Sequence, residues 1–131
     1  MRFLVILSLL AAAGCEAVAP VPERGRNLYL NNCALCHGRS AKGDGAYASE
    51  LIVPPADLTG LAARNAGVFP TSDVMAKIYG YPGRHQQSVM PEFGPVLTSR
   101  TVMWTDENGV VLETPEALID LVEYLRSVQR P

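Results

Sequence analysis

The pentapeptide Cys33-Ala34-Leu35-Cys36-His37 limits what this chain can fold around more than any other stretch of its sequence. On one helical turn, side chains at positions i and i+3 have Cβ atoms about 5–6 Å apart. Two thiols at that spacing can add to the two vinyl groups on one edge of a haem, and an imidazole directly after the second thiol can bind the iron. The pattern CxxCH is the attachment signature of c-type haem. We therefore predict one covalent haem, held by Cys33 and Cys36 and ligated by His37.

Three other uses of the cysteine pair compete with haem attachment. A redox-active dithiol usually follows a strand in an α/β pattern, and no such pattern precedes Cys33. A zinc site needs two further ligands, and outside the motif the chain offers only Cys15 and His85. A disulfide between Cys33 and Cys36 would leave His37 without a role. Haem attachment is therefore favoured over thiol chemistry and over a metal or disulfide site.

Length and composition limit the chain to one small domain. It has 131 residues, with 11 Lys+Arg against 13 Asp+Glu and a formal net charge of −2. That length fits a single domain, and the charge balance lacks the basic excess of a nucleic-acid binder. The chain carries no phosphate loop, calcium loop or hydrolase motif, so no small-molecule substrate is predicted.

The first fourteen residues are typical of an export signal. Arg2 precedes an apolar run over residues 3–13 that only Ser8 interrupts. The run matches the apolar core of a signal peptide, about 7–15 residues, and is too short to span a bilayer. It ends in small residues and then Cys15, which resembles a bacterial lipoprotein signal, although Ala12 stands where such signals usually have Leu. We predict removal of residues 1–14 and a lipid anchor on Cys15; the alternative is an ordinary cleaved signal.

After this signal the sequence predicts a tether and then one domain. Pro20 and Pro22 each fix φ and disfavour helix in the residue before them. Residues 15–22 are therefore assigned to the lipidated Cys and an extended tether. The remaining chain contains no internal repeat and a single haem motif, so residues 23–131 are predicted to form one domain.

Helical patterns lie mainly at the two ends of that domain. One covers residues 23–36. The other begins after Thr114, a suitable N-cap, with Pro115 at the first helical position and an apolar stripe beyond it. Between them the sequence predicts a helix at 72–80, a shorter one at 46–52, and a hairpin within 101–112 that turns at Asn108-Gly109.

The iron of such a haem needs a sixth ligand, and four residues are candidates: Met75, His85, Met90 and Met103. Met75 lies on the apolar stripe of the predicted helix at 72–80, and Met103 stands between two apolar residues, so both are expected to pack in the core. His85 lies in a polar run and is expected to be solvated. Met90 stands alone in a loop before Pro91, which favours an extended backbone and a projecting side chain. We predict Met90 as the sixth ligand, with His85 or a ligand-free position as alternatives.

With these residues in place, the chain resembles a small class I cytochrome c over about residues 24–130. Beside the haem motif and its Gly38, the matching residues are Gly25, Tyr29, Lys42-Gly43-Asp44-Gly45, Pro54-Pro55-Ala56-Asp57-Leu58, Met90-Pro91-Glu92-Phe93, Leu121 and Tyr124. The resemblance implies an all-α, cytochrome c-like fold. In that fold small helices and long loops wrap around one haem c, and the N- and C-terminal helices cross.

The resemblance also implies two contacts. Gly25 would admit the aromatic ring of Tyr124 where the terminal helices cross. The carbonyl of Pro54 or Pro55 would accept the second ring N–H of His37, which fixes the orientation of the imidazole and makes it a better ligand.

Two stretches are longer than in a minimal member of that family, residues 81–90 and residues 96–113. The second contains Trp104, the single tryptophan of the chain. Its indole N–H either donates to a haem propionate or belongs to a simply packed side chain.

Two strong ligands, His37 and Met90, would leave the iron no open position, so single-electron transfer is expected. A thioether ligand favours ferrous iron and raises the reduction potential relative to two histidines. The predicted protein is a periplasmic electron carrier and not an enzyme. Its expected partners are a redox donor protein, an acceptor protein and the membrane reached through Cys15, with no nucleic acid. The alternatives are a haem-bearing subunit of a larger membrane oxidoreductase, a gas-sensing domain with a displaceable ligand, and a CxxC thiol oxidoreductase.

Overall fold

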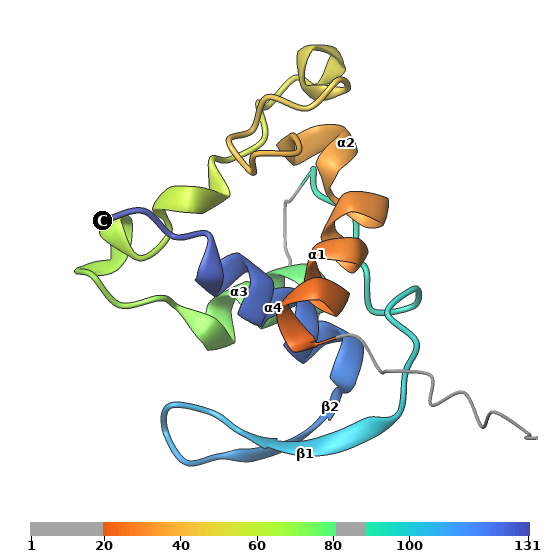
Figure 1. Ribbon diagram of the computed structural model, residues 1–131, viewed down its shortest axis with the longest axis vertical. Helices are drawn as coiled ribbons and strands as arrows, with labels where there is room; N and C mark the ends of the chain where they lie inside the picture. Colours follow the sequence, from red (N-terminus) through yellow and green to blue (C-terminus); the bar gives the residue numbers. More distant parts are fainter. Residues whose placement is uncertain (1–19, 81–88) are drawn as a thin grey trace, which may run out of the picture.

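The computed structural model describes residues 20–80 and 89–131. The elements follow in the order α1 (Val21–Asn32), α2 (Ala34–His37), the 3-10 turns η1 (Ala48–Glu50), η2 (Leu58–Gly60) and η3 (Ala63–Asn65), α3 (Thr71–Tyr79), β1 (Thr101–Thr105), β2 (Val111–Pro115) and α4 (Glu116–Ser127). Along the long axis, α2 lies toward one end of the molecule and the hairpin of β1 and β2 at the other (Figure 1). The predicted all-α class is therefore confirmed as a mainly helical fold to which a two-stranded antiparallel sheet is added.

Several predicted features lie outside the described residues. These are the signal at 1–14, Cys15 with most of the tether, and His85. Within residues 20–80 and 89–131, no helix combines the length and the apolar character needed to pass through a bilayer.

The terminal helices α1 and α4 cross at a glycine. A Cβ atom added to Gly25 would lie 2.0 Å from the backbone oxygen of Asp120 and 2.8 Å from Cβ of Tyr124. One turn further along α1, the ring of Tyr29 packs against the ring of Tyr124, with centroids 5.3 Å apart. The crossing that the family resemblance implied at Gly25 and Tyr124 is confirmed, and the absent side chain is what lets the two backbones approach.

An ion pair also joins the two helices at this crossing. Arg24 donates from Nε to one carboxylate oxygen of Asp120 at 2.7 Å and from Nη2 to the other at 3.0 Å. Asp120 is only 5% exposed. A bidentate guanidinium–carboxylate pair fixes direction as well as distance. It therefore holds α1 in register on α4.

The first helix begins earlier and breaks earlier than the sequence predicted. α1 starts at Val21, so the end of the expected extended tether is helical. Pro22 is tolerated there because the first-turn N–H groups have no partner within the helix. The predicted continuous helix over 23–36 is interrupted at Cys33, where φ is −119° and ψ is −33°, and α2 continues from Ala34.

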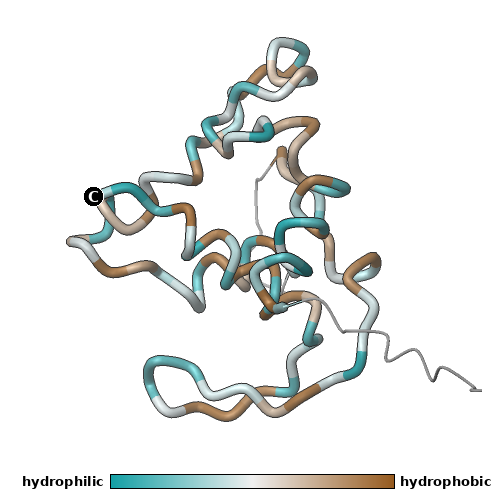
Figure 2. Tube along the Cα trace, in the orientation of Figure 1, coloured by the Kyte–Doolittle hydropathy of each residue, from teal (hydrophilic) through white to brown (hydrophobic). Residues whose placement is uncertain are grey.

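The core forms where α1, α3 and α4 meet. α4 supplies much of it, through Leu118, Leu121, Val122 and Leu125. Figure 2 shows apolar residues of these helices gathered in the central region of the molecule. The predicted helix at 72–80 is confirmed as α3, whereas the helix expected at 46–52 shortens to the single 3-10 turn η1.

The predicted hairpin is confirmed and extends beyond its expected end, to Pro115. Its turn is held by Asp106, whose carboxylate accepts from the backbone N–H groups of Asn108 and Val110, while Gly109 adopts a φ of 81°. Because β2 runs to Pro115, Thr114 is a buried strand residue and not the predicted N-cap of α4. Pro115 occupies the N-cap position.

Candidate haem attachment site

The end of α1 and the single turn of α2 carry the three motif residues together. The N–H of Cys33 closes α1 by donating to the carbonyl of Tyr29 at 2.8 Å. The N–H of Cys36 and the N–H of His37 then both donate to the carbonyl of Cys33, at 3.2 and 2.9 Å. The chain therefore places both thiols and the imidazole on one compact turn, as the spacing predicted.

The loop that follows folds back and satisfies the open carbonyl groups of α2. The carbonyl of Leu35 accepts from the N–H of Tyr47 at 2.9 Å, that of Cys36 from Gly45 at 3.0 Å, and that of His37 from Gly43 at 2.8 Å. A helix end normally leaves such carbonyls unpaired. Here each of the three is bonded, so the turn that carries the motif is held on two sides.

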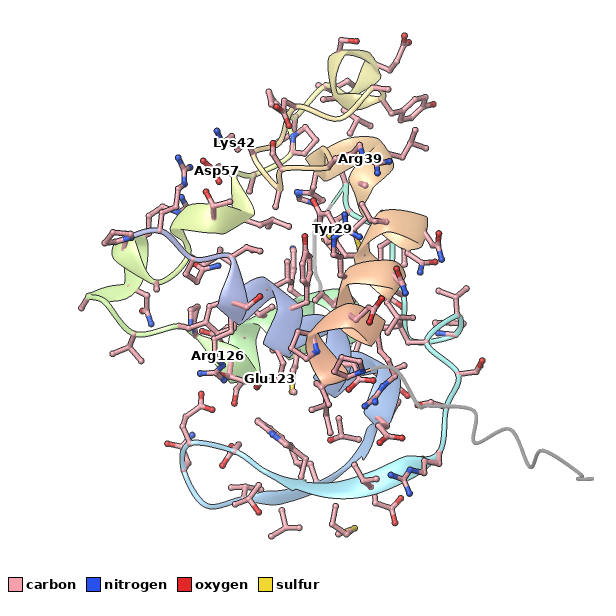
Figure 3. The ribbon with its side chains drawn as sticks, in the orientation of Figure 1. Tyr29, Arg39, Lys42, Asp57, Glu123 and Arg126 are labelled. Carbon is pink, nitrogen blue, oxygen red and sulfur yellow. The ribbon has the colours of Figure 1, made fainter. Side chains whose placement is uncertain are left out.

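A buried phenol also holds this turn. Tyr29 donates its hydroxyl to the carbonyl of Gly38 at 2.6 Å, and its side chain is fully buried. Figure 3 shows Tyr29 between α1 and the loop after α2. Burial, with smaller effects of Cys33 and Tyr124, raises the pKa of Tyr29, so the phenol remains a donor. From the sequence, Tyr29 was identified only as a residue that matches the cytochrome c family, and its position four residues before Cys33 was the available signal for this role.

Replacing Tyr29 by phenylalanine is expected to lower the free energy of unfolding by about 1 kcal/mol. The Gly38 carbonyl would lose its phenol donor and keep only the N–H of Ala41, at 3.1 Å. The shift of the urea midpoint measures the loss. Tyr47→Phe is the matched control, because Tyr47 is 50% exposed and should change little. Equal losses in both variants would contradict the role of the Tyr29 hydroxyl.

The imidazole of His37 is oriented through one of its nitrogens. Nδ1 lies 2.9 Å from the carbonyl oxygen of Ala56. A carbonyl only accepts, so Nδ1 carries the proton and Nε2 keeps a free lone pair. This arrangement is the usual one for a histidine that binds a metal.

The carbonyl that accepts from His37 Nδ1 is not the expected one, which was that of Pro54 or Pro55. The carbonyl of Pro55 faces Gly43 instead: a Cβ atom on Gly43 would meet that oxygen closely. Successive carbonyls of an extended segment point to opposite sides. The prediction was therefore wrong by one or two positions, and the carbonyl of Ala56 is the one that meets His37.

The two thiols are not joined to each other. Cys33 and Cys36 are free and partly buried. Burial, followed by the neighbouring Cys36, raises the pKa of the Cys33 thiol to about 12. Reactive redox cysteines have a lowered pKa, so Cys33 has the opposite character. Cys33 also follows the helix α1 and not a strand, unlike the usual redox-active dithiol. As for a zinc site, residues 20–80 and 89–131 contain no group of three or more His, Cys, Asp or Glu side chains that could hold a metal ion.

Met90 stands on a segment that is bonded to the end of α3. The N–H of Phe93 donates to the carbonyl of Ile78 at 2.8 Å, and that of Gly94 to Tyr79 at 3.1 Å. The Met90 side chain is partly buried and packs against the core. In Figure 1 the segment after residue 88 begins level with α2 along the long axis of the molecule.

The other two methionine candidates have different surroundings. Met75 is 4% exposed within α3, as expected of a core residue. Met103 was expected to pack but is 66% exposed. The alternation of β1 turns its neighbours Val102 and Trp104 inward and Met103 outward. Trp104 packs against the core, whereas its bond to a propionate remains a prediction.

These residues fit a covalently bound haem. The turn supplies two unpaired thiols and an imidazole with a free nitrogen. Like Cys33, the apolar side chains of Leu58, Leu61, Val74, Met90 and Phe93 pack against the core and stay partly exposed. Soft sulfur, imidazole and apolar surroundings are the donor set and environment that haem iron takes in proteins.

Comparison with known proteins agrees with this fit. The sequence profile described as cytochrome c matches residues 22–129, which is most of the chain. The matched range includes α1 from its second residue, the CxxCH turn, Met90 and the whole of α4. No curated protein and no solved structure matches the chain.

Proposed function

The chain belongs to the cytochrome c family, whose members carry covalent haem c and transfer electrons with it, and from this we propose which residues hold the haem. Cys33 and Cys36 would form the two thioether bonds, and His37 and Met90 would be the two protein ligands of the iron. The observation that carries the proposal is the hydrogen bond between His37 Nδ1 and the carbonyl of Ala56, at 2.9 Å, because it leaves Nε2 free for iron.

When bound, the haem supplies one-electron chemistry between ferric and ferrous iron. The residues of the chain set how that chemistry runs. With His37 and Met90 both bound to it, the iron would have no open position for oxygen or a substrate. The Met90 thioether would favour the ferrous state and raise the reduction potential relative to that of a haem with two histidine ligands. Partly buried apolar side chains such as Val74 and Phe93 would exclude water from a haem packed on them, which would disfavour the extra positive charge of the ferric state.

The proposed location is the periplasmic face of a membrane. An export signal over residues 1–14 and a lipid anchor on Cys15 would keep the domain there. Its partners would be a protein that donates electrons and a protein that accepts them. The two lysines, Lys42 and Lys77, do not form a ring, so docking through a strong cationic patch is not proposed.

Mass spectrometry of the matured protein tests the attachment. Expressed with a c-type maturation system, the chain should carry one haem that denaturation does not release, and no free thiol at Cys33 or Cys36. Cys33→Ala with Cys36→Ala should abolish covalent haem. Cys15→Ser is the matched control, which should retain the haem and lose the lipid and the membrane association. A colourless wild-type protein with two titratable thiols in the motif would overturn the proposal.

A further inference from the structure

Gln129 and Arg130, near the C-terminus, form hydrogen bonds to a segment far away in the sequence, residues 57–62. Arg130 donates from its backbone N–H to the carbonyl of Thr59 at 2.8 Å, from Nε to the Thr59 hydroxyl at 2.7 Å and from Nη2 to the Asp57 carboxylate at 2.8 Å. Gln129 accepts from the N–H of Ala62 at 3.0 Å and donates to the carbonyl of Leu58 at 2.8 Å. Five hydrogen bonds therefore join two consecutive residues to residues 57–62, about seventy positions away.

The receiving segment is itself ordered by local bonds. One carboxylate oxygen of Asp57 accepts from both the N–H and the hydroxyl of Thr59, at 2.8 and 2.6 Å. Thr59 is 4% exposed, although it is polar. These Thr59 bonds, with smaller effects of Arg130 and Arg64, lower the pKa of Asp57, so the acceptor stays charged at neutral pH.

This segment begins at the residue that orients the imidazole. Ala56, the acceptor of His37 Nδ1, directly precedes Asp57. On the other side, the N–H of Leu58 donates to the carbonyl of Ala41 at 2.7 Å, which ties the segment to the loop after α2. In Figure 3, Asp57 lies beside Lys42 of that loop. The Ala56 carbonyl is thus held between the loop after α2 and the C-terminal residues.

We propose that Gln129 and Arg130 are positioning residues for the haem ligand: through Asp57, Leu58 and Thr59 they hold the Ala56 carbonyl against His37 Nδ1. The inference rests on the proposed role of His37. A firm Nδ1–H···O=C bond makes the imidazole a better electron donor to iron, which favours the ferric state. Loosening the C-terminal residues weakens that bond without touching either ligand.

Arg130→Leu and Gln129→Leu in the haem-bearing protein test the proposal. Each should raise the reduction potential, so that the ferrous-to-ferric ratio at a fixed electrode potential rises about threefold. This effect is smaller than the loss in metal affinity or activity, roughly 10–100-fold, that follows removal of a direct hydrogen-bond partner of a metal ligand. Exchange of the His37 Nδ1 proton with solvent, followed by NMR, should be several times faster. Arg130→Lys retains the charge that meets Asp57 and should lie between wild type and Arg130→Leu.

Arg126→Leu is the matched control. Arg126 also lies at the end of α4, and its bonds go to Glu123, Thr71 and the ring of Phe69, none of which lies in residues 56–62. It should leave the potential and the His37 proton exchange unchanged. If the Arg130 and Gln129 variants lose stability only, or if Arg126→Leu shifts the potential equally, the inference is overturned. A wild-type protein in which His37 does not bind iron would refute the proposed function itself.

Discussion

Met90→Ala should remove the red charge-transfer band of the ferric protein and lower its reduction potential by roughly 0.1–0.3 V, part of the ~0.8 V that axial ligands span. The band depends on a sulfur bound to ferric iron, so it disappears with the thioether. The potential falls because water or another hard ligand then favours ferric iron. Visible spectra of the oxidised protein and a redox titration measure the two effects.

Two variants show whether the effect is specific to Met90. Met103 is exposed on β1, so Met103→Ala should leave both the band and the potential as they are. Met75 is buried in α3, so Met75→Ala should lower stability by about 2–5 kcal/mol and keep the band. If Met90→Ala leaves the band and potential unchanged while His85→Ala alters them, the sixth ligand is His85 and the assignment of Met90 is wrong.

Gly25→Ala is expected to destabilise the protein by about 1–2 kcal/mol, the net of an overpacking cost and a gain in helix propensity. The added Cβ would lie 2.0 Å from the backbone oxygen of Asp120, which cannot rotate away as a flexible side chain could. The helices α1 and α4 would have to separate, at a cost of about 1–3 kcal/mol or more for overpacking. The better helix propensity of alanine, about 1 kcal/mol, offsets only part of it.

Asn27→Ala is the matched control, because Asn27 lies exposed on the same helix and two residues away. Asn27→Ala should raise the helix propensity of α1 without a clash against α4, and should leave the thermal midpoint unchanged or slightly higher. Thermal unfolding followed by far-UV circular dichroism measures both variants. A Gly25→Ala protein as stable as wild type would show that the helices do not cross at this glycine.

The features that local chemistry dictates could be predicted from the sequence. The CxxCH turn was found because thioether attachment requires two thiols one helical turn apart with an imidazole beside them. The helix at 72–80 and most of α4 follow from an apolar stripe of helical period. The turn at Asn108-Gly109 follows from the preference of such pairs for left-handed backbone.

The sequence was less informative about which way side chains and carbonyls point and about where elements begin and end, as with the break of the first helix at Cys33 and the single 3-10 turn at Ala48–Glu50. Met103 was expected inside, but a strand alternates its side chains, and only packing against the helices decides which face turns inward. The acceptor for His37 was placed at Pro54 or Pro55, one or two positions from Ala56, because the path of the segment is set by its contact with Gly43. Thr114 was expected as a cap, but the hairpin extended through it.

The amino-acid sequence by itself therefore determined which two sulfurs and which imidazole share one turn, and where the longer helices lie. Those properties depend on residues within one or two turns of each other. The tertiary structure alone decided how Gly25 meets Asp120, which carbonyl holds His37, and that Arg130 reaches Thr59. These contacts join positions far apart in the chain, and no local pattern of residue types encodes them because they form only once the helices have packed.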